Sequence, residues 1–233
     1  MIPLRDTNPR SSFPWITLGI ILANCIVFFR EVIASPDELE VLMGTYGLIP
    51  ARTTAFFAGD SVPVSLAILP FFTSMFLHGG WMHILGNMWF LWIFGDNVED
   101  RVGHLRYVGL YLCAGLAGAA AHVLFSGDSV LPTVGASGAI AGVMGAYMVT
   151  FPGARILTLV PIIFYPATFE VPAVIILLYW LLLQFASGAA SLAATDTGQG
   201  GVAWFAHVGG FVIGIPLMLL LRRPRQGRRS SWA

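Results

Sequence analysis

Charged residues are scarce in this chain. Only 10% of the 233 residues are charged, whereas an average soluble domain has about 25%. That is too few to cover the surface of a water-soluble globule of this length. The scarcity excludes an ordinary cytosolic enzyme, a disordered chain and a nucleic-acid-binding protein. With 57% hydrophobic residues and a mean hydropathy of +0.79, the composition indicates a polytopic membrane protein.

Cysteine is also rare. The two cysteines, Cys25 and Cys113, lie within apolar runs and show no metal-ligand spacing. We therefore expect them to face lipid or pack in the core, without a disulfide between them. No cleavable signal peptide is evident, because the N-terminus is polar and the first apolar run is long enough to remain as a span.

Apolar segments define the predicted fold. A helix needs about 20 apolar residues to cross a bilayer core of about 30 Å. Six segments are good candidates: residues 14–29, 78–95, 105–125, 131–151, 171–191 and 202–221. The sequence thus predicts an all-α bundle of six transmembrane helices.

Two further apolar stretches, residues 62–77 and 156–169, are short and interrupted by prolines. We expect both to lie in the membrane interface or to pack against the bundle, with one or two extra spans as the alternative. The predicted organisation is an N-terminal segment of residues 1–13, a six-span domain of residues 14–221 and a basic tail of residues 222–233.

The chain contains no lysine, and its arginines are unevenly distributed. With six spans, one side collects Arg5, Arg10, Arg101, Arg106, Arg155, Arg222, Arg223, Arg225, Arg228 and Arg229. The other side has only Arg30 and Arg52, with the acidic residues Glu31, Asp37, Glu38, Glu40, Asp60, Asp128 and Asp196. The positive-inside rule then places both termini in the cytoplasm. We expect a multi-pass protein of a bacterial inner membrane.

Polar residues within the predicted spans are few, and such residues tend to mark function. His83 and Asn87 share one face of the second span, Ser137 lies in the fourth and His207 in the sixth. His83, Ser137 and His207 lie about five or six residues into their spans, roughly 8–9 Å below the outer end. This common depth suggests one polar site in the outer half of the bilayer.

Small residues accompany these polar groups. Gly138 and Gly142 lie beside the stripe that contains Ser137, and Gly210 and Gly214 follow His207 at helical spacing. Small faces let membrane helices approach closely, which a serine hydroxyl needs in order to reach a histidine nitrogen. Plain helix packing, with the serine as a small filler, remains an equal alternative at this stage.

Other residues could compete for the same role. His78, His104 and His122 fall near span ends, and His78 and His122 lie on the same outer side as His207. No carboxylate falls at the depth of Ser137. A serine hydrolase built here would therefore be a dyad, without a buried acid to orient its histidine.

These residues resemble the rhomboid family of intramembrane serine proteases over nearly the whole chain. The string GASG, residues 135–138, matches the family's GxSG motif and begins with Gly135. HGGWMHILGN and AHVGGFVIG match the second-span and sixth-span patterns, and GDNVEDR and YGLIPAR resemble bacterial members. The loop before the second span departs from many members because it lacks a Trp-Arg pair.

The resemblance implies a mechanism. Ser137 would be the nucleophile, His207 the base, and His83 and Asn87 the oxyanion donors. The expected partners are the lipid bilayer and membrane proteins with a transmembrane helix, which would enter beside residues 171–201. The family's chemistry implies no metal or organic cofactor.

Two rival interpretations are non-enzymatic. An inactive rhomboid-like scaffold would bind transmembrane helices through the same small faces. A small transporter would need polar residues along its whole path, but the inner halves of the second, fourth and sixth spans are almost entirely apolar.

Overall fold

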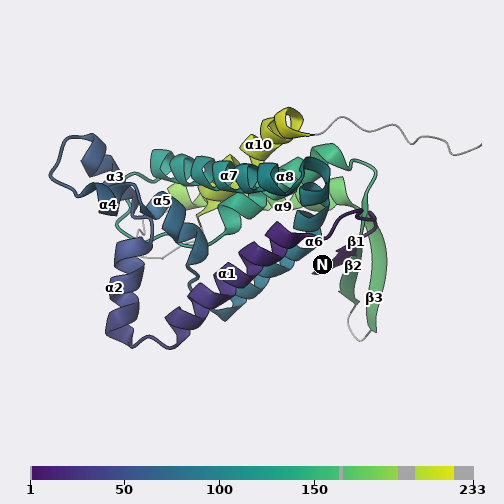
Figure 1. Cartoon of the computed structure of the whole chain (residues 1–233), viewed down its shortest axis with the longest axis horizontal. Coiled ribbons are helices and arrows are strands. Elements are labelled where there is room, and N and C mark those ends of the chain that lie inside the picture. Colours follow the sequence, from purple (N-terminus) through teal and green to yellow (C-terminus); the bar gives the residue numbers. More distant parts are fainter. Residues whose placement is uncertain (1, 163–164, 194–202, 223–233) are drawn as a thin grey trace, which may run out of the picture.

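Helices make up most of the chain (Figure 1). The computed structural model describes residues 2–162, 165–193 and 203–222. The long helices are α1 (Trp15–Val32), α6 (Trp81–Val102), α7 (His104–Phe125), α8 (Ser137–Thr150), α9 (Ala173–Ala193) and α10 (Trp204–Leu221). Shorter helices between α1 and α6 are α2 (Pro36–Tyr46), α3 (Pro50–Phe57), α4 (Val64–Ala67), α5 (Pro70–Thr73) and the 3₁₀ turn η1 (Ser74–Phe76). The strands are β1 (Ile2–Asp6), β2 (Arg155–Ile162) and β3 (Tyr165–Pro172). Residues 223–233 of the predicted tail and 194–202 of the predicted entry region, which include Asp196, lie outside the described residues.

Helix α8 lies at the centre of the bundle. Every residue from Gly138 to Tyr147 is buried, and α6, α7, α9 and α10 all pack against this helix. Its 14 residues extend roughly 21 Å at 1.5 Å per residue, less than the hydrocarbon thickness. A helix enclosed by other helices does not have to match the bilayer, because protein rather than lipid surrounds it.

The structure does not confirm the predicted count of six spans. Among the described residues, α1, α7 and α10 are long and apolar enough to cross a membrane. A fourth span is added if residues 64–76 and α6, which meet at a bend of 75°, are taken as one broken span. The fourth predicted span is shorter than expected, because residues 131–136 are not helical and Thr133 pairs with Leu48. The six-span count therefore stays a prediction.

The all-α prediction is wrong at one end of the molecule. Strands β1, β2 and β3 form an antiparallel sheet in that order, and the sheet lies beside the N-terminus (Figure 1). Residues 156–162 and 165–169 of the second apolar stretch, expected as an interfacial or packed segment, form most of the antiparallel β2–β3 hairpin. Ile156 and Thr158 of β2 are fully buried, so the hairpin packs through alternate residues of a strand. Residues 2–6 complete the sheet through a pairing with β2 that no local sequence pattern reveals.

A buried carboxylate attaches α1 to α6. Glu99 of α6 accepts hydrogen bonds from the backbone N–H groups of Ile16 and Thr17 at 2.9 and 2.8 Å, and from the Thr17 hydroxyl at 2.7 Å. Helix α1 follows Pro14 and has no side-chain cap of its own, so Glu99 satisfies N–H groups that would otherwise lack partners. His104 Nδ1 lies 2.6 Å from the same carboxylate.

The two ends of the described chain lie at the same end of the bundle. Ser11 bonds to Asp100 near the end of α6, and Arg106 near the start of α7 donates to the carbonyl of Leu221 at 3.1 Å. Because α6 ends here, its first residues lie at the opposite end, where His78 meets Glu31 at the end of α1. The bundle thus has a terminal end and a far end.

Backbone hydrogen bonds hold the long connection between α1 and α6 at the far end. Leu48 and Thr133 exchange N–H···O bonds of 3.0 and 2.8 Å, and Gly135 N–H donates to the Ser74 carbonyl at 2.8 Å. The N–H of His78 donates to Glu31 at 3.1 Å. The bonds of Leu48 and Ser74 fix the connection against the segment before α8, and the His78 bond fixes it to α1, without a Trp-Arg pair.

Candidate active site

A cavity of about 680 Å³ lies where α6, α8 and α10 begin. Its lining includes all four residues predicted to carry the chemistry: His83, Asn87, Ser137 and His207. His83 is the third residue of α6, Ser137 the first of α8 and His207 the fourth of α10. Three polar groups thus lie in the first turns of three neighbouring helices, at the end of the bundle remote from the termini.

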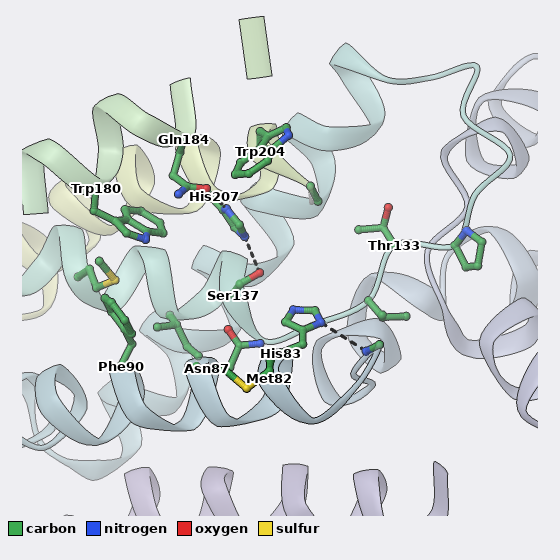
Figure 2. A pocket seen from close by; sticks show the side chains of 17 residues that line it. Met82, His83, Asn87, Phe90, Thr133, Ser137, Trp180, Gln184, Trp204 and His207 are labelled. Atoms are coloured by element: carbon green, nitrogen blue, oxygen red, sulfur yellow. Dashed lines mark hydrogen bonds between the residues drawn. The ribbon is translucent and has the colours of Figure 1, made fainter. Parts of the chain in front are cut away.

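Ser137 and His207 are in direct contact across this cavity (Figure 2). The distance from Ser137 Oγ to His207 Nε2 is 2.7 Å, and the His207 side chain is buried. The sequence placed Ser137 about six residues into a helix. That placement is wrong, because residues 131–136 are not part of a helix and α8 begins at Ser137 itself. The hydroxyl therefore lies at a helix N-terminus, where backbone N–H groups are free of helical partners.

Glycines allow α8 and α10 to approach closely enough for this contact. A Cβ at position 210 would lie 2.9 Å from the carbonyl carbon of Gly138, and one at position 214 would lie 2.6 Å from that of Gly142. Gly138 itself faces Ala206, the residue before His207. Any larger side chain would force the helices apart, so these glycines set the separation at which serine and histidine meet.

His83 presents one ring nitrogen to the cavity region near Gly135. Its Nδ1 accepts the N–H of Gly79 at 3.3 Å, so in the neutral ring Nε2 carries the proton. A Cβ at position 135 would lie 2.7 Å from that Nε2 and 3.5 Å from Asn87 Nδ2. Gly135 has a φ of +125°, a conformation that other residues rarely adopt. Two side-chain donors thus converge on a space that only glycine leaves open.

Asn87 has an unused donor. It is buried, and no hydrogen-bond acceptor for its Nδ2 occurs in the part of the chain that the structure describes. A buried N–H group without a partner is costly and rare in native proteins. Such a group is suited to an acceptor that arrives with a bound molecule.

One polar partner of His207 escaped the sequence analysis. Gln184 of α9 is buried, and its Oε1 lies 2.5 Å from His207 Nδ1. The Trp180 ring, one turn earlier on α9, lies with its centroid 5.6 Å from that of His207. Gln184 is the one amide side chain in the apolar run 173–186, a signal that could have drawn attention to it.

The competing histidines are engaged elsewhere. His122 Nε2 pairs with the Thr133 hydroxyl at 2.9 Å, and His104 pairs with Glu99. His78 packs against the ring of His83 and does not line the cavity. No carboxylate from the described residues lines the cavity, and no three metal-binding side chains gather in that part of the chain.

Comparison with known proteins decides the family. A family model described as the Rhomboid domain matches residues 66–224, which include the whole cavity lining. The chain belongs to the rhomboid family. The resemblance inferred from the GASG motif and the two histidine-containing patterns is therefore confirmed, and with it a rhomboid-like fold and an integral membrane protein.

Relatives within the rhomboid family come from several kinds of organism. RHOMBOID-like protein 2 of Arabidopsis thaliana is 35% identical over 93% of this chain and 70% of its own length. RHOMBOID-like protein 6, mitochondrial, of the same plant is 28% identical over 91% of this chain and 71% of its own length. The Rhomboid protease GluP of Bacillus subtilis is 41% identical over 33% of this chain and 14% of its own length. Other plant relatives are longer, and the chain spans 55% of two of them. Because a mitochondrial relative is among these proteins, the predicted bacterial inner membrane is not supported.

Proposed function

We propose that this chain is an intramembrane serine endopeptidase that cleaves transmembrane-anchored proteins through a Ser137–His207 dyad. The observation that carries the proposal is the 2.7 Å contact between Ser137 Oγ and His207 Nε2 inside a cavity that His83 and Asn87 also line. Membership of the rhomboid family and the name of the Bacillus subtilis relative, a rhomboid protease, support the same reaction class. We propose the bundle of residues 14–221 as the unit that performs it.

The reaction begins with proton transfer. His207 Nε2 takes the hydroxyl proton as Ser137 Oγ attacks the scissile carbonyl carbon, giving a tetrahedral oxyanion. His207 then returns the proton to the leaving amine, the C–N bond breaks and an acyl-serine remains. A water molecule then attacks the acyl carbon as His207 takes its proton. The acyl C–O bond breaks, His207 returns the proton to Ser137 Oγ, and the new carboxyl end is released.

The oxyanion would be stabilised by His83 and Asn87. The Nε2 proton of His83 and the Nδ2 group of Asn87 converge beside Gly135, two residues before the nucleophile. Prepositioned donors of this kind are each worth about 2.7–4 kcal/mol of transition-state stabilisation. The free N–H groups at the start of α8 add to the same electrostatic field.

A substrate helix would enter beside α9. Leu178, Leu182 and Phe185 on this helix are 47%, 63% and 62% exposed, and they form an apolar surface suited to lipid or another transmembrane helix. The inner side of α9 reaches the cavity through Trp180 and Gln184. Cleavage requires an extended peptide, so segments of low helix propensity would be preferred.

The placement of the site suggests the orientation in the membrane. The cavity lies at the far end of the bundle, whereas the described arginines 5, 10, 101, 106, 155 and 222 belong to segments near the terminal end. With this end in the cytoplasm, the cavity would open toward the outer half of the bilayer.

The rival function is a catalytically inactive scaffold that binds transmembrane helices. A serine-directed fluorophosphonate probe, followed by a cleavage assay on a reporter membrane protein, separates the two. We expect the parent to label and to cleave, and Ser137→Ala and His207→Ala each to lose both activities. Cleavage by Ser137→Ala at the parental rate would show that the proposed mechanism is wrong.

A further inference from the structure

Helix α9 contacts His207 at two points. Gln184 Oε1 lies 2.5 Å from Nδ1, the ring nitrogen that does not face Ser137. Trp180, one turn earlier, covers the ring at a centroid distance of 5.6 Å. Both side chains come from the same face of α9, and Gln184 is only 9% exposed. The geometry therefore places the histidine between a serine on one side and an amide on the other.

The hydrogen-bond chemistry of this arrangement is directional. A carboxamide oxygen carries no proton and can only accept, so Nδ1 must donate to it. In a neutral imidazole the other nitrogen, Nε2, then has a lone pair, which faces the Ser137 hydroxyl. The opposite tautomer would set the Nδ1 lone pair against the amide oxygen, a repulsive and unsatisfied contact in a buried place.

We propose that Gln184 is a positioning residue that holds His207 in the tautomer and orientation required of a base. This inference rests on the proposed protease function and deepens it. Serine hydrolases with a triad use a carboxylate for this task, and loss of the correct tautomer lowers their rate by orders of magnitude. Gln184 performs the orienting part without a charge, and burying a neutral amide costs less than burying an anion.

The location of Gln184 adds a consequence for substrate entry. Helix α9 packs against α10, which carries His207, while the outer face of α9 is exposed and apolar. Displacing α9 to admit a substrate helix would withdraw Gln184 and Trp180 from His207 together. The base would then be correctly oriented only when α9 rests against α10, which links closure around the substrate to chemical competence.

The test uses the full chain reconstituted in lipid vesicles, with Gln184→Leu and Gln184→Glu beside the parent. Leucine removes the acceptor at similar volume, so we expect kcat for a reporter membrane substrate to fall at least about tenfold, with KM within about twofold. Glutamate accepts the same Nδ1 proton, so fluorophosphonate labelling should persist. The pH at which labelling of Gln184→Glu is half-maximal should be higher than in the parent, because a carboxylate stabilises the protonated, non-basic form of His207.

Leu220→Ala is the control, because this exposed leucine lies near the terminal end of α10, outside both the cavity lining and the apolar surface of α9. It should keep the parental kcat and the parental pH midpoint of labelling. If the parent cleaves and Gln184→Leu retains the parental kcat, the positioning role is refuted. Should Gln184→Leu fail to fold, a parental pH midpoint in Gln184→Glu would refute it instead. A parent that neither labels at Ser137 nor cleaves would overturn the proposed protease function itself.

Discussion

Gly214 of α10 lies directly against the backbone of Gly142 in α8. A Cβ at position 214 would come within 2.6 Å of the Gly142 carbonyl carbon and 2.7 Å of its Cα. Backbone atoms cannot move aside as a flexible side chain can, so the two helices are as close as a pair of glycines allows. The same close packing continues at Gly210 and Gly138, one turn nearer Ser137 and His207.

Gly214→Ala should therefore destabilise the bundle. Overpacking of this kind costs about 1–3 kcal/mol, and separating α8 from α10 should also weaken the contact between Ser137 and His207. Thermal unfolding in detergent and fluorophosphonate labelling measure the two effects. Gly109→Ala on α7 is the control, because a Cβ at this position would have no atom from another part of the chain within 4 Å. It should leave Tm unchanged or slightly higher, and equal Tm values for both variants would contradict the packing argument.

Gly135→Ala should lower activity strongly and destabilise the fold less than Gly214→Ala does. Alanine is strained at a φ of +125°, and its Cβ would occupy the space 2.7 Å from His83 Nε2 where the oxyanion is expected. We expect kcat to fall about 100-fold or more. Gly59→Ala provides the comparison, since Gly59 has a φ of +95° but open surroundings. Similar losses of kcat in the two variants would indicate a backbone effect and not a blocked site.

Asn87→Ala should separate activity from stability. The variant removes a buried donor that has no partner among the described residues, so the free energy of unfolding should hardly change. The rate kcat should fall about 10²–10³-fold if Nδ2 stabilises the oxyanion. Asn24→Ala on α1 is the control, because Asn24 is also a buried asparagine but donates a hydrogen bond to the Ile20 carbonyl. This variant should lower the free energy of unfolding and leave kcat unchanged. Unchanged kcat in Asn87→Ala would remove this residue from the mechanism.

Glu99→Gln should loosen α1 from α6. The amide retains only one acceptor oxygen for a site that binds two backbone N–H groups, the Thr17 hydroxyl and His104. We expect a loss of about 1–3 kcal/mol in the free energy of unfolding. Because Glu99 lies at the terminal end, kcat per folded molecule should not change. The double variant Glu99→Gln/Thr17→Val should lose less free energy of unfolding than the two single variants lose in sum. Full additivity would argue against a shared network.

Much of the site could be predicted from the sequence because polar residues are so few in its apolar segments. Ser137, His207, His83 and Asn87 all line one cavity, as their common depth suggested. Glycine spacing indicated which helix faces would meet. The start of α8 could not be predicted, because residues 131–136 are as apolar as a span. Their non-helical backbone includes Thr133, which pairs with Leu48 far away in the chain.

The sequence by itself determined the class of protein and the chemistry available to it. Low charge and long apolar runs require a membrane, and the few polar residues at one depth, Ser137 and His207 among them, are the reactive groups that the sequence predicts. Only the tertiary structure decided the separation of 2.7 Å, the sheet built from residues 2–6 and the β2–β3 hairpin, and the partner of His207 Nδ1. The physical reason is the same in each case. Burial and hydropathy are properties of single segments, whereas a hydrogen bond or a strand pairing depends on how two distant segments pack together.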